Sequence, residues 1–105
     1  MALVTKEIND NTPLISISVA ADLVGLHPRT LMLYEYEKLL IPKRSPTGRR
    51  MYSQNEIKKL QFIQYLTQRK KLNFAGIRII FSMMEKGKEN GIDLRGMMFP
   101  DFAEK

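Results

Sequence analysis

Polar and basic side chains gather at the start of one predicted helix, in the stretch GLHPRTLMLYE (residues 25–35). Pro28 suits the first position of a helix, where its missing N–H costs nothing, and His27 precedes it at the cap. Arg29 and Thr30 follow in the first turn, where polar side chains can reach beyond the protein surface. Arginine can hold guanine through two hydrogen bonds, and the N–H groups of a helix start attract phosphate. The chemistry predicted for this tip is the binding of a polyanion.

A second cluster of basic residues follows in IPKRSPTGRRMYS (residues 41–53). The turn formers SPTG separate the pair Lys43 and Arg44 from the pair Arg49 and Arg50. This pattern predicts a β-hairpin whose two arms carry four positive charges and no acid. We call this hairpin the wing, and we expect its arginines to lie along a DNA backbone or in the minor groove beside the helix.

Further side chains join the candidate set, and most have an alternative role. Tyr34 and Tyr52 can each hydrogen-bond a phosphate through the hydroxyl, or close the core with the ring. Ser18 is predicted as a helix cap and as a DNA contact. His27 is predicted to be a helix cap or a neighbour of phosphate rather than a base reader. The predicted DNA-binding residues are Ser18, His27, Arg29, Thr30, Tyr34, Lys43, Arg44, Arg49, Arg50 and Tyr52.

The elements that position these residues are predicted from apolar spacing and helix caps. LISIS (residues 14–18) alternates apolar and polar side chains, which is typical of a short strand. Ser18 then caps a helix that stops at Gly25. The next helix begins at Pro28 and ends near Leu40. Two helices joined by a short turn that contains a glycine have the spacing of a helix-turn-helix.

Two further helices are predicted after the wing. SQNE (residues 53–56) is a capping box, and it begins a helix that runs to about Arg69. Another helix begins at Asn73 and ends within residues 87–91. Glycine and proline keep any helix in the following tail short. The predicted fold is mainly α: a winged helix-turn-helix with a short strand, a two-stranded hairpin and four helices.

The composition favours one basic globular domain. The chain has 105 residues, with 17 Lys and Arg against 11 Asp and Glu. The excess is local, because residues 27–59 contain eight basic and three acidic side chains, and residues 68–89 contain six and two. Two basic zones predict a surface that meets a polyanion. The alternative, from charge alone, is a basic surface that serves solubility.

Several classes of site are excluded by residues that the sequence lacks. There is no cysteine and only one histidine, which excludes disulfides, thiolate metal sites and a histidine zinc site. No carboxylate pair, nucleophile–base set or phosphate-cradling glycine loop is present, so we expect neither an enzyme nor a cofactor. No apolar run reaches the roughly 18 residues that span a membrane, and no signal-peptide pattern begins the chain. We therefore expect a soluble intracellular protein without a membrane partner.

Residues 15–88 resemble the DNA-binding head of the MerR family of bacterial transcription regulators. The family pattern has R-x-Y-E at the close of the second helix, then G-L-L-x-P, a wing that ends in R-x-Y-S, and a capped third helix. The matching pieces are MLYE (32–35), KLLIP (38–42), RMYS (50–53), QNEIKKLQFI (54–63) and LNFAGIRIIF (72–81). The family usually has arginine where this chain has Met32, which removes one expected polar contact.

Within the family, HPRTLMLYE and the short C-terminus are most similar to the heat-shock repressor (HspR) branch. The resemblance implies a homodimer on double-stranded DNA that represses chaperone genes from an inverted-repeat operator, with a DnaK-type chaperone as co-repressor. It also implies a place in the bacterial cytoplasm, at the nucleoid. The recognition-helix contacts that it implies are Arg29, Thr30 and Tyr34, and the wing contacts are Arg44, Arg49, Arg50 and Tyr52.

We predict three segments: a flexible lead-in over residues 1–14, the winged helix-turn-helix over 15–90 and a short apolar tail over 91–105. Larger members of the family dimerise through a long C-terminal helix that leads into an effector domain, and we expect no such ligand sensing here. Two roles stay open for the apolar side chains of the tail. They fold back on the core or seal a small dimer interface, or they dock the chaperone as a peptide.

Two other functions also stay open. One is a DNA-architectural or excisionase-like recombination accessory factor, because such factors use the same winged domain. The other is a chaperone- or protein-interaction module whose basic charge is incidental. Symmetric protection of one inverted repeat would favour the repressor, and cooperative binding over direct repeats would favour the accessory factor. Weak, sequence-indifferent DNA affinity would favour the interaction module.

Overall fold

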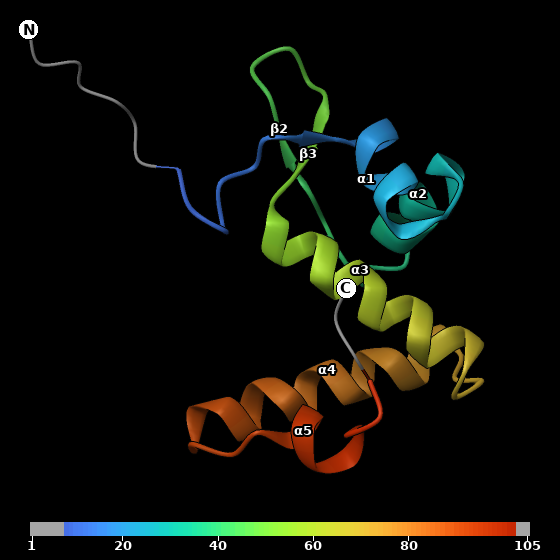
Figure 1. Ribbon diagram of the computed structural model, residues 1–105, viewed down its shortest axis with the longest axis vertical. Coiled ribbons are helices and arrows are strands. Elements are labelled where there is room, and N and C mark those ends of the chain that lie inside the picture. Colours follow the sequence, from blue (N-terminus) through green and yellow to red (C-terminus); the bar gives the residue numbers. More distant parts are fainter. Residues whose placement is uncertain (1–7, 103–105) are drawn as a thin grey trace, which may run out of the picture.

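A computed structural model of the chain describes residues 8–102, which form five helices and a small three-stranded sheet (Figure 1). Along the chain the elements are β1 (Ile15–Ser16), α1 (Ile17–Val24), α2 (Pro28–Tyr36), β2 (Lys43–Arg44), β3 (Arg50–Tyr52), α3 (Gln54–Gln68), α4 (Phe74–Glu89) and α5 (Leu94–Met98). The sheet, α1 and α2 lie on one side of α3, and α4 and α5 lie on the other. None of these five helices is long and apolar enough to cross a membrane. The mainly helical winged helix-turn-helix is confirmed.

The cap of α1 is Ser16, which corrects the prediction that Ser18 caps this helix. The Ser16 hydroxyl accepts a hydrogen bond from the Val19 N–H at 3.4 Å. Ser16 is also paired with Met51 in the sheet, so the helix begins directly where the strand ends. Ser18 lies in the first turn and is exposed. Gly25 ends α1 in the left-handed conformation (φ 69°, ψ 34°), as predicted, because glycine adopts it without a steric penalty.

The start of α2 is confirmed in detail. His27 is the cap, and its Nδ1 accepts a hydrogen bond from the Arg29 N–H at 3.1 Å. Pro28 occupies the first helical position, where its ring fixes the helical φ and no backbone hydrogen bond is lost. The local sequence is therefore enough to begin the helix at this point.

The end of α2 corrects the prediction, because the helix stops at Tyr36 and not near Leu40. Lys38 adopts a left-handed conformation (φ 61°), which turns the chain back on the helix. The Leu39 N–H then donates to the Tyr34 carbonyl at 2.8 Å, closing the end of the helix. This turn places Leu39 and Leu40 in the core instead of on a helical face.

The predicted strand and the wing form one antiparallel sheet, in the order β1-β3-β2. Ile15 pairs with Tyr52 across β1 and β3, and Lys43 pairs with Met51 across β2 and β3. In the turn of the wing Gly48 has a φ of 85°, and its N–H donates to the Ser45 carbonyl at 2.9 Å. The wing is thus attached through β1 to the start of the helix-turn-helix.

The core is built mainly on α3, which the predicted capping box begins. The Glu56 N–H donates to Ser53 Oγ at 3.1 Å, and the Ser53 N–H donates to Glu56 Oε1 at 3.0 Å. Asn73 caps α4 through a hydrogen bond from the Gly76 N–H at 2.8 Å, as predicted. The largest fully buried side chains are Leu31, Leu39, Tyr52, Leu60, Ile63, Leu66 and Ile77.

The tail contains a fifth helix, α5, where four helices in all were predicted. Asp93 caps it by accepting a hydrogen bond from the Gly96 N–H at 3.1 Å. Phe99 and Phe102 then pack against the core, while Met97 remains exposed. The aromatic part of the tail therefore folds back on the domain, which is one of the two roles left open from the sequence.

The lead-in is attached to α3 where the structure describes it. The Asn55 N–H donates to the Asp10 carbonyl at 3.0 Å, and the Asn55 side-chain amide donates to Asn11 Oδ1 at 2.6 Å. Residues 1–7 of the predicted flexible segment and residues 103–105 of the predicted tail lie outside the described residues.

Candidate nucleic-acid interface

The tip of α2 presents the polar side chains that the sequence singled out. His27 and Arg29 are exposed, and Thr30 is half-buried in the first turn. Since His27 Nδ1 accepts the Arg29 N–H, the imidazole of His27 serves as the helix cap. No hydrogen bond or ion pair to another described residue occupies the Arg29 guanidinium. Arg29 is therefore the side chain of this tip that is available for a base edge or a phosphate.

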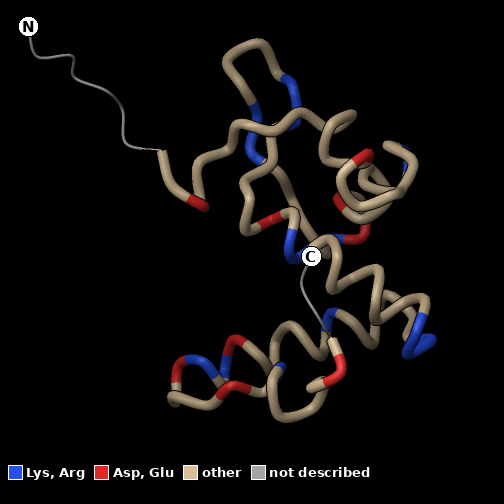
Figure 2. The backbone as a smooth tube through the Cα atoms, viewed as in Figure 1, with Lys and Arg blue, Asp and Glu red and all other residues tan. Residues whose placement is uncertain are grey.

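The wing divides its four basic side chains into two pairs. Lys43 and Arg49 are exposed, and neither forms an ion pair with another described residue. Arg44 and Arg50 are both bound by the protein itself, and their side chains are 47% and 27% exposed. Both arms of the hairpin nevertheless carry positive charge along the backbone tube (Figure 2). The pairs therefore differ in their partners and not in their place along the hairpin.

Glu35 of α2 is the partner of both bound arginines. Its Oε2 lies 3.1 Å from Arg44 Nη2, and its Oε1 lies 2.5 Å from Arg50 Nε. Arg44 Nη1 also donates to the Gly48 carbonyl at 3.0 Å, which ties the contact to the turn of the wing. The hydrogen bond from Arg50 and the positive charges of both arginines lower the pKa of Glu35, against the opposing effect of burial. One carboxylate thus joins the recognition helix to both arms of the wing.

The strand register explains why the arginines need this carboxylate. Arg44 and Arg50 are directly opposite each other in the antiparallel pair, so they share one face of the hairpin. Like charges in that position repel and destabilise the pair. The Glu35 side chain extends from α2 to that face of the hairpin and compensates both charges. Lys43 is opposite Met51 and has no such neighbour in the register.

Tyr34 and Tyr52 are core residues, although both were predicted as DNA contacts with core packing as the alternative. Tyr34 is buried and meets Phe74 edge-to-face at 6.1 Å between ring centroids, and burial raises its pKa. Tyr52 is 0% exposed. Burial, and next the negative charge of Glu35, raise the pKa of Tyr52 to about 12. Within residues 8–102 the Tyr52 hydroxyl has no hydrogen-bond partner. Of the two roles that the sequence left open, packing favours the ring in the core for both.

Three charged residues that position the interface were missed from the sequence. Besides Glu35, these are Glu37 and Arg78, which connect the end of α2 to α4. Arg78 Nη1 donates to the Glu37 carbonyl at 2.8 Å and to Glu37 Oε1 at 3.1 Å. The available signal was that Glu35 and Glu37 are two of only three acids in the basic zone 27–59. An acid retained in a basic zone indicates a specific partner.

The turn between α3 and α4 is a further basic element that was not placed in the candidate set. Arg69 and Lys71 are exposed there, and Lys71 has a left-handed φ of 58°. The turn lies against α2, because Thr67 and Phe74 line a cavity with Thr30. The signal in the sequence is the basic run QRKK (residues 68–71), which begins the second basic zone.

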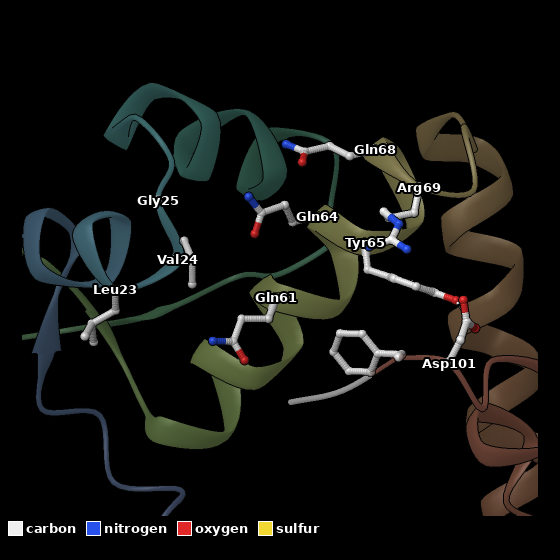
Figure 3. Close-up of a pocket in the computed structure, with 10 residues that line it drawn as sticks. Leu23, Val24, Gly25, Gln61, Gln64, Tyr65, Gln68, Arg69 and Asp101 are labelled. Carbon is white, nitrogen blue, oxygen red and sulfur yellow. Dashed lines mark hydrogen bonds between the residues drawn. The ribbon is translucent and has the colours of Figure 1, made fainter. Parts of the chain in front are cut away.

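A cleft of about 570 Å³ lies between the end of α1, α3 and the tail (Figure 3). Gln61, Gln64 and Gln68 of α3 line it, and Asp101, the one carboxylate among its described lining residues, accepts a hydrogen bond from the Tyr65 hydroxyl at 2.6 Å. No nucleophile–base set is found among these lining residues. Within residues 8–102, no cluster of three or more His, Asp or Glu is arranged to hold a metal ion.

Comparison with known proteins identifies the type of this domain. Residues 15–84 match the model of the family described as MerR HTH family regulatory protein. The chain is 42% identical over 77 residues to the heat shock protein HspR of Streptomyces coelicolor, which covers 73% of this chain and 51% of that protein. It is 36% identical over 84 residues to the HTH-type transcriptional regulator GlnR of Bacillus anthracis, which covers 80% of this chain and 64% of that protein. The chain therefore aligns with between half and two thirds of the length of these relatives.

Proposed function

The chain belongs to the MerR family of helix-turn-helix regulators, and on that premise we propose that it is a sequence-specific DNA-binding repressor of heat-shock and chaperone genes. The similarity to HspR supports the choice of target genes. The resemblance of the domain to repressors of an inverted-repeat operator supports a homodimer, at least on DNA. We place its action in the bacterial cytoplasm, at the nucleoid, and by binding rather than by catalysis.

The observation that carries this proposal is the Arg29 guanidinium at the exposed start of α2, which no other residue among 8–102 engages. An α-helix fits the major groove of DNA, and residues at its N-terminal end reach base edges there. Lys43 and Arg49 on the wing are available for the flanking backbone at the same time. The curated relatives named as transcriptional regulators favour this function over the excisionase-like accessory factor.

The first experiment is a gel shift with footprinting on the upstream region of the gene itself and on a chaperone-operon promoter, against excess random DNA. A footprint over one inverted repeat is the expected result, and it would also establish the dimer on DNA. Binding that random DNA removes completely would contradict sequence-specific repression. A ladder of cooperative shifts over direct repeats would favour the accessory factor instead.

Two substitutions separate base reading from backbone contact. Arg29→Ala should cost about 1–3 kcal/mol on the operator and relax specificity at one base step, because Arg29 is proposed to read a base. Arg49→Ala should weaken all sequences alike and reduce the salt slope of binding by roughly one, because Arg49 is proposed to bind a phosphate. Equal losses on operator and random DNA for Arg29→Ala would reduce it to a backbone contact.

We also propose that a DnaK-type chaperone acts as co-repressor through the tail. The support is the exposed pair Met97 and Met98 beside the half-buried Phe99 and Phe102, which pack against the core. Removal of the whole tail would also remove these two aromatic rings from the core, so the sharper test is the double variant Met97→Ser and Met98→Ser. It should lose chaperone binding in a titration and keep the melting temperature of the domain. Unchanged chaperone binding would contradict this role.

A further inference from the structure

We propose that Glu35 determines DNA specificity by holding Arg44 and Arg50 away from non-specific DNA. The inference rests on the proposed function as a DNA-binding regulator. Glu35 itself does not bind DNA in this role, because phosphate repels a carboxylate. It acts through the two guanidiniums that it binds, which makes it a positioning residue of the interface.

The first step is the competition between carboxylate and phosphate for the same guanidiniums. Arginine binds either anion through charge-assisted hydrogen bonds of similar geometry. Both oxygens of Glu35 are used, one by Arg44 and one by Arg50. Glu35 takes the Nη2 of Arg44 and the Nε of Arg50, so a phosphate meets guanidiniums whose charge is already compensated and whose N–H donors are partly used. Lys43 and Arg49 are not subject to this competition within the described part of the chain.

The second step is that a negative charge at the position of Glu35 destabilises the helix itself. Glu35 lies in the last turn of α2 (Pro28–Tyr36), where the partial negative charge of the helix end disfavours a carboxylate. Despite this unfavourable position, the Glu35 side chain is only 21% exposed, and both of its carboxylate oxygens accept hydrogen bonds from arginine. A negative charge in this position is explained by the two arginines of the wing and not by helix stability.

The consequence concerns random and specific DNA differently. On random DNA, where α2 finds no matching bases, affinity comes from the number of phosphates that cations neutralise. Glu35 lowers that number by occupying Arg44 and Arg50. On the operator, α2 is seated in the groove, and the same ion pairs fix the direction of the wing relative to the helix. The ratio of specific to random affinity is therefore higher with Glu35 than without it.

The test compares Glu35→Gln with Glu37→Gln, a matched control at the same end of α2. Each variant removes one negative charge and one charged partner of an arginine, but Glu37 binds Arg78 of α4 and not the wing. The operator is first selected from a random duplex library with the wild-type protein. Affinities for this operator and for a random duplex are then measured over a range of salt concentrations.

For Glu35→Gln we expect about tenfold tighter binding to the random duplex near 0.1 M salt, with a salt slope steeper by about one to two. Operator affinity should change by less than about threefold, so that specificity falls by at least about threefold. Glu37→Gln should shift both affinities by the same small factor and keep the wild-type specificity. Equal specificity for Glu35→Gln and Glu37→Gln would overturn the inference.

Folding and the proposed function are controlled separately. Glu35→Asp keeps the charge with a shorter reach, so it should give a random-duplex salt slope between those of the wild type and Glu35→Gln. A slope steeper than that of Glu35→Gln would contradict the charge competition, because the variant that keeps the negative charge cannot release more positive charge than the variant that loses it. If the wild-type protein selects no sequence, the proposed function fails. The random-duplex slopes of the two glutamine variants still decide in that case whether Glu35 competes with phosphate for Arg44 and Arg50.

Discussion

The wing and the tail are both short segments folded against the helices, but they are held by different forces. The wing is joined to α2 by the ion pairs of Glu35 with Arg44 and Arg50. The tail is joined to α3 by rings: Phe102 lies 5.1 Å from both Phe62 and Tyr65 between centroids. The contacts of the wing with α2 are exchangeable charges, whereas the tail is held mainly by half-buried rings, with the ion pair of Lys70 and Asp101 beside them.

The difference matters for a protein that binds a polyanion. Ion pairs near the surface weaken as salt rises, and a phosphate can replace the carboxylate in them. Aromatic contacts depend on excluded water and are almost indifferent to salt. The wing can therefore adjust to DNA while the tail keeps α3 and α4 in a fixed arrangement. Stability and recognition are separated between the two ends of the molecule.

The largest effect on the attachment of the tail is expected from removing the ring of Phe62, which lies at the centre of the aromatic contacts between α3 and the tail. Phe62→Ala should lower the free energy of unfolding by about 3–5 kcal/mol, because Phe62 is buried and contacts Phe81, Phe99 and Phe102. Urea denaturation at low and high salt should give the same loss. The control Met97→Ala, at a side chain 69% exposed, should change stability by less than about 0.5 kcal/mol. A loss below that of a surface variant would show that the rings do not hold the tail.

Two tyrosine hydroxyls, one in the wing and one bonded to the tail, are expected to affect stability in opposite directions. Tyr52→Phe should stabilise the protein by roughly 1 kcal/mol, because the buried hydroxyl at the base of the wing has no partner in the part of the chain described. Tyr65→Phe should have the opposite sign and destabilise it, because that hydroxyl donates to Asp101 at 2.6 Å. Thermal unfolding of both variants measures the difference. A Tyr52→Phe variant that loses stability, or loses DNA affinity, would return Tyr52 to a polar role.

Acid should release the wing and leave the aromatic cluster of the tail in place. The pKa of Glu35 is lower in the folded protein than its ordinary value of 4.5, so its ion pairs stabilise the fold fully above that pH. This contribution is lost as the pH falls through the lowered pKa. We expect the stability difference between wild type and Glu35→Gln, about 1 kcal/mol, to be constant from pH 7 to 5 and to vanish below. A difference that does not change with pH would exclude the ion pairs as its cause.

The smallest expected effect lies at the end of α2. Lys38 has a φ of 61°, a conformation that costs a residue with a Cβ atom about 1 kcal/mol. The pattern G-L-L-x-P, which this stretch resembles, has glycine at the same position. Lys38→Gly should therefore raise the free energy of unfolding by about 0.5 kcal/mol, after the entropy cost of glycine. The matched change Lys58→Gly, inside α3, should lower it by about 1 kcal/mol. Equal effects would contradict the role of backbone conformation.

Local signals made much of the fold predictable. The cap at His27, the stop at Gly25 and the capping box at Ser53 each act within four residues, and all three are confirmed. The end of α2 at Tyr36 was not predicted, because Lys38 takes a left-handed conformation and a lysine in the sequence does not indicate one. The cap of α1 was misplaced by two residues, because sheet pairing fixes Ser16. Pairing between distant segments is not written in local spacing.

The candidate site was predictable as a place and less so as a set of contacts. Exposure of Arg29 and Arg49 follows from their position at a helix tip and beside a turn. The burial of Tyr34 and the occupation of Arg44 depend on partners elsewhere in the chain, Phe74 and Glu35. A basic side chain in a motif is therefore only a candidate until its neighbours are known.

The pairing of Ile15 with Tyr52 has a consequence for how the domain folds. It encloses α1, α2 and the wing in one loop of chain, because β1 precedes these elements and β3 follows them. Closing such a loop costs chain entropy before any contact inside it is gained, and contacts this far apart in sequence slow folding. The recognition helix and the wing are expected to reach their relative places in the same cooperative step. A nascent chain that ends before β3 therefore contains α1 and α2, but it lacks the strand pairing that places α2 and the wing together for DNA binding.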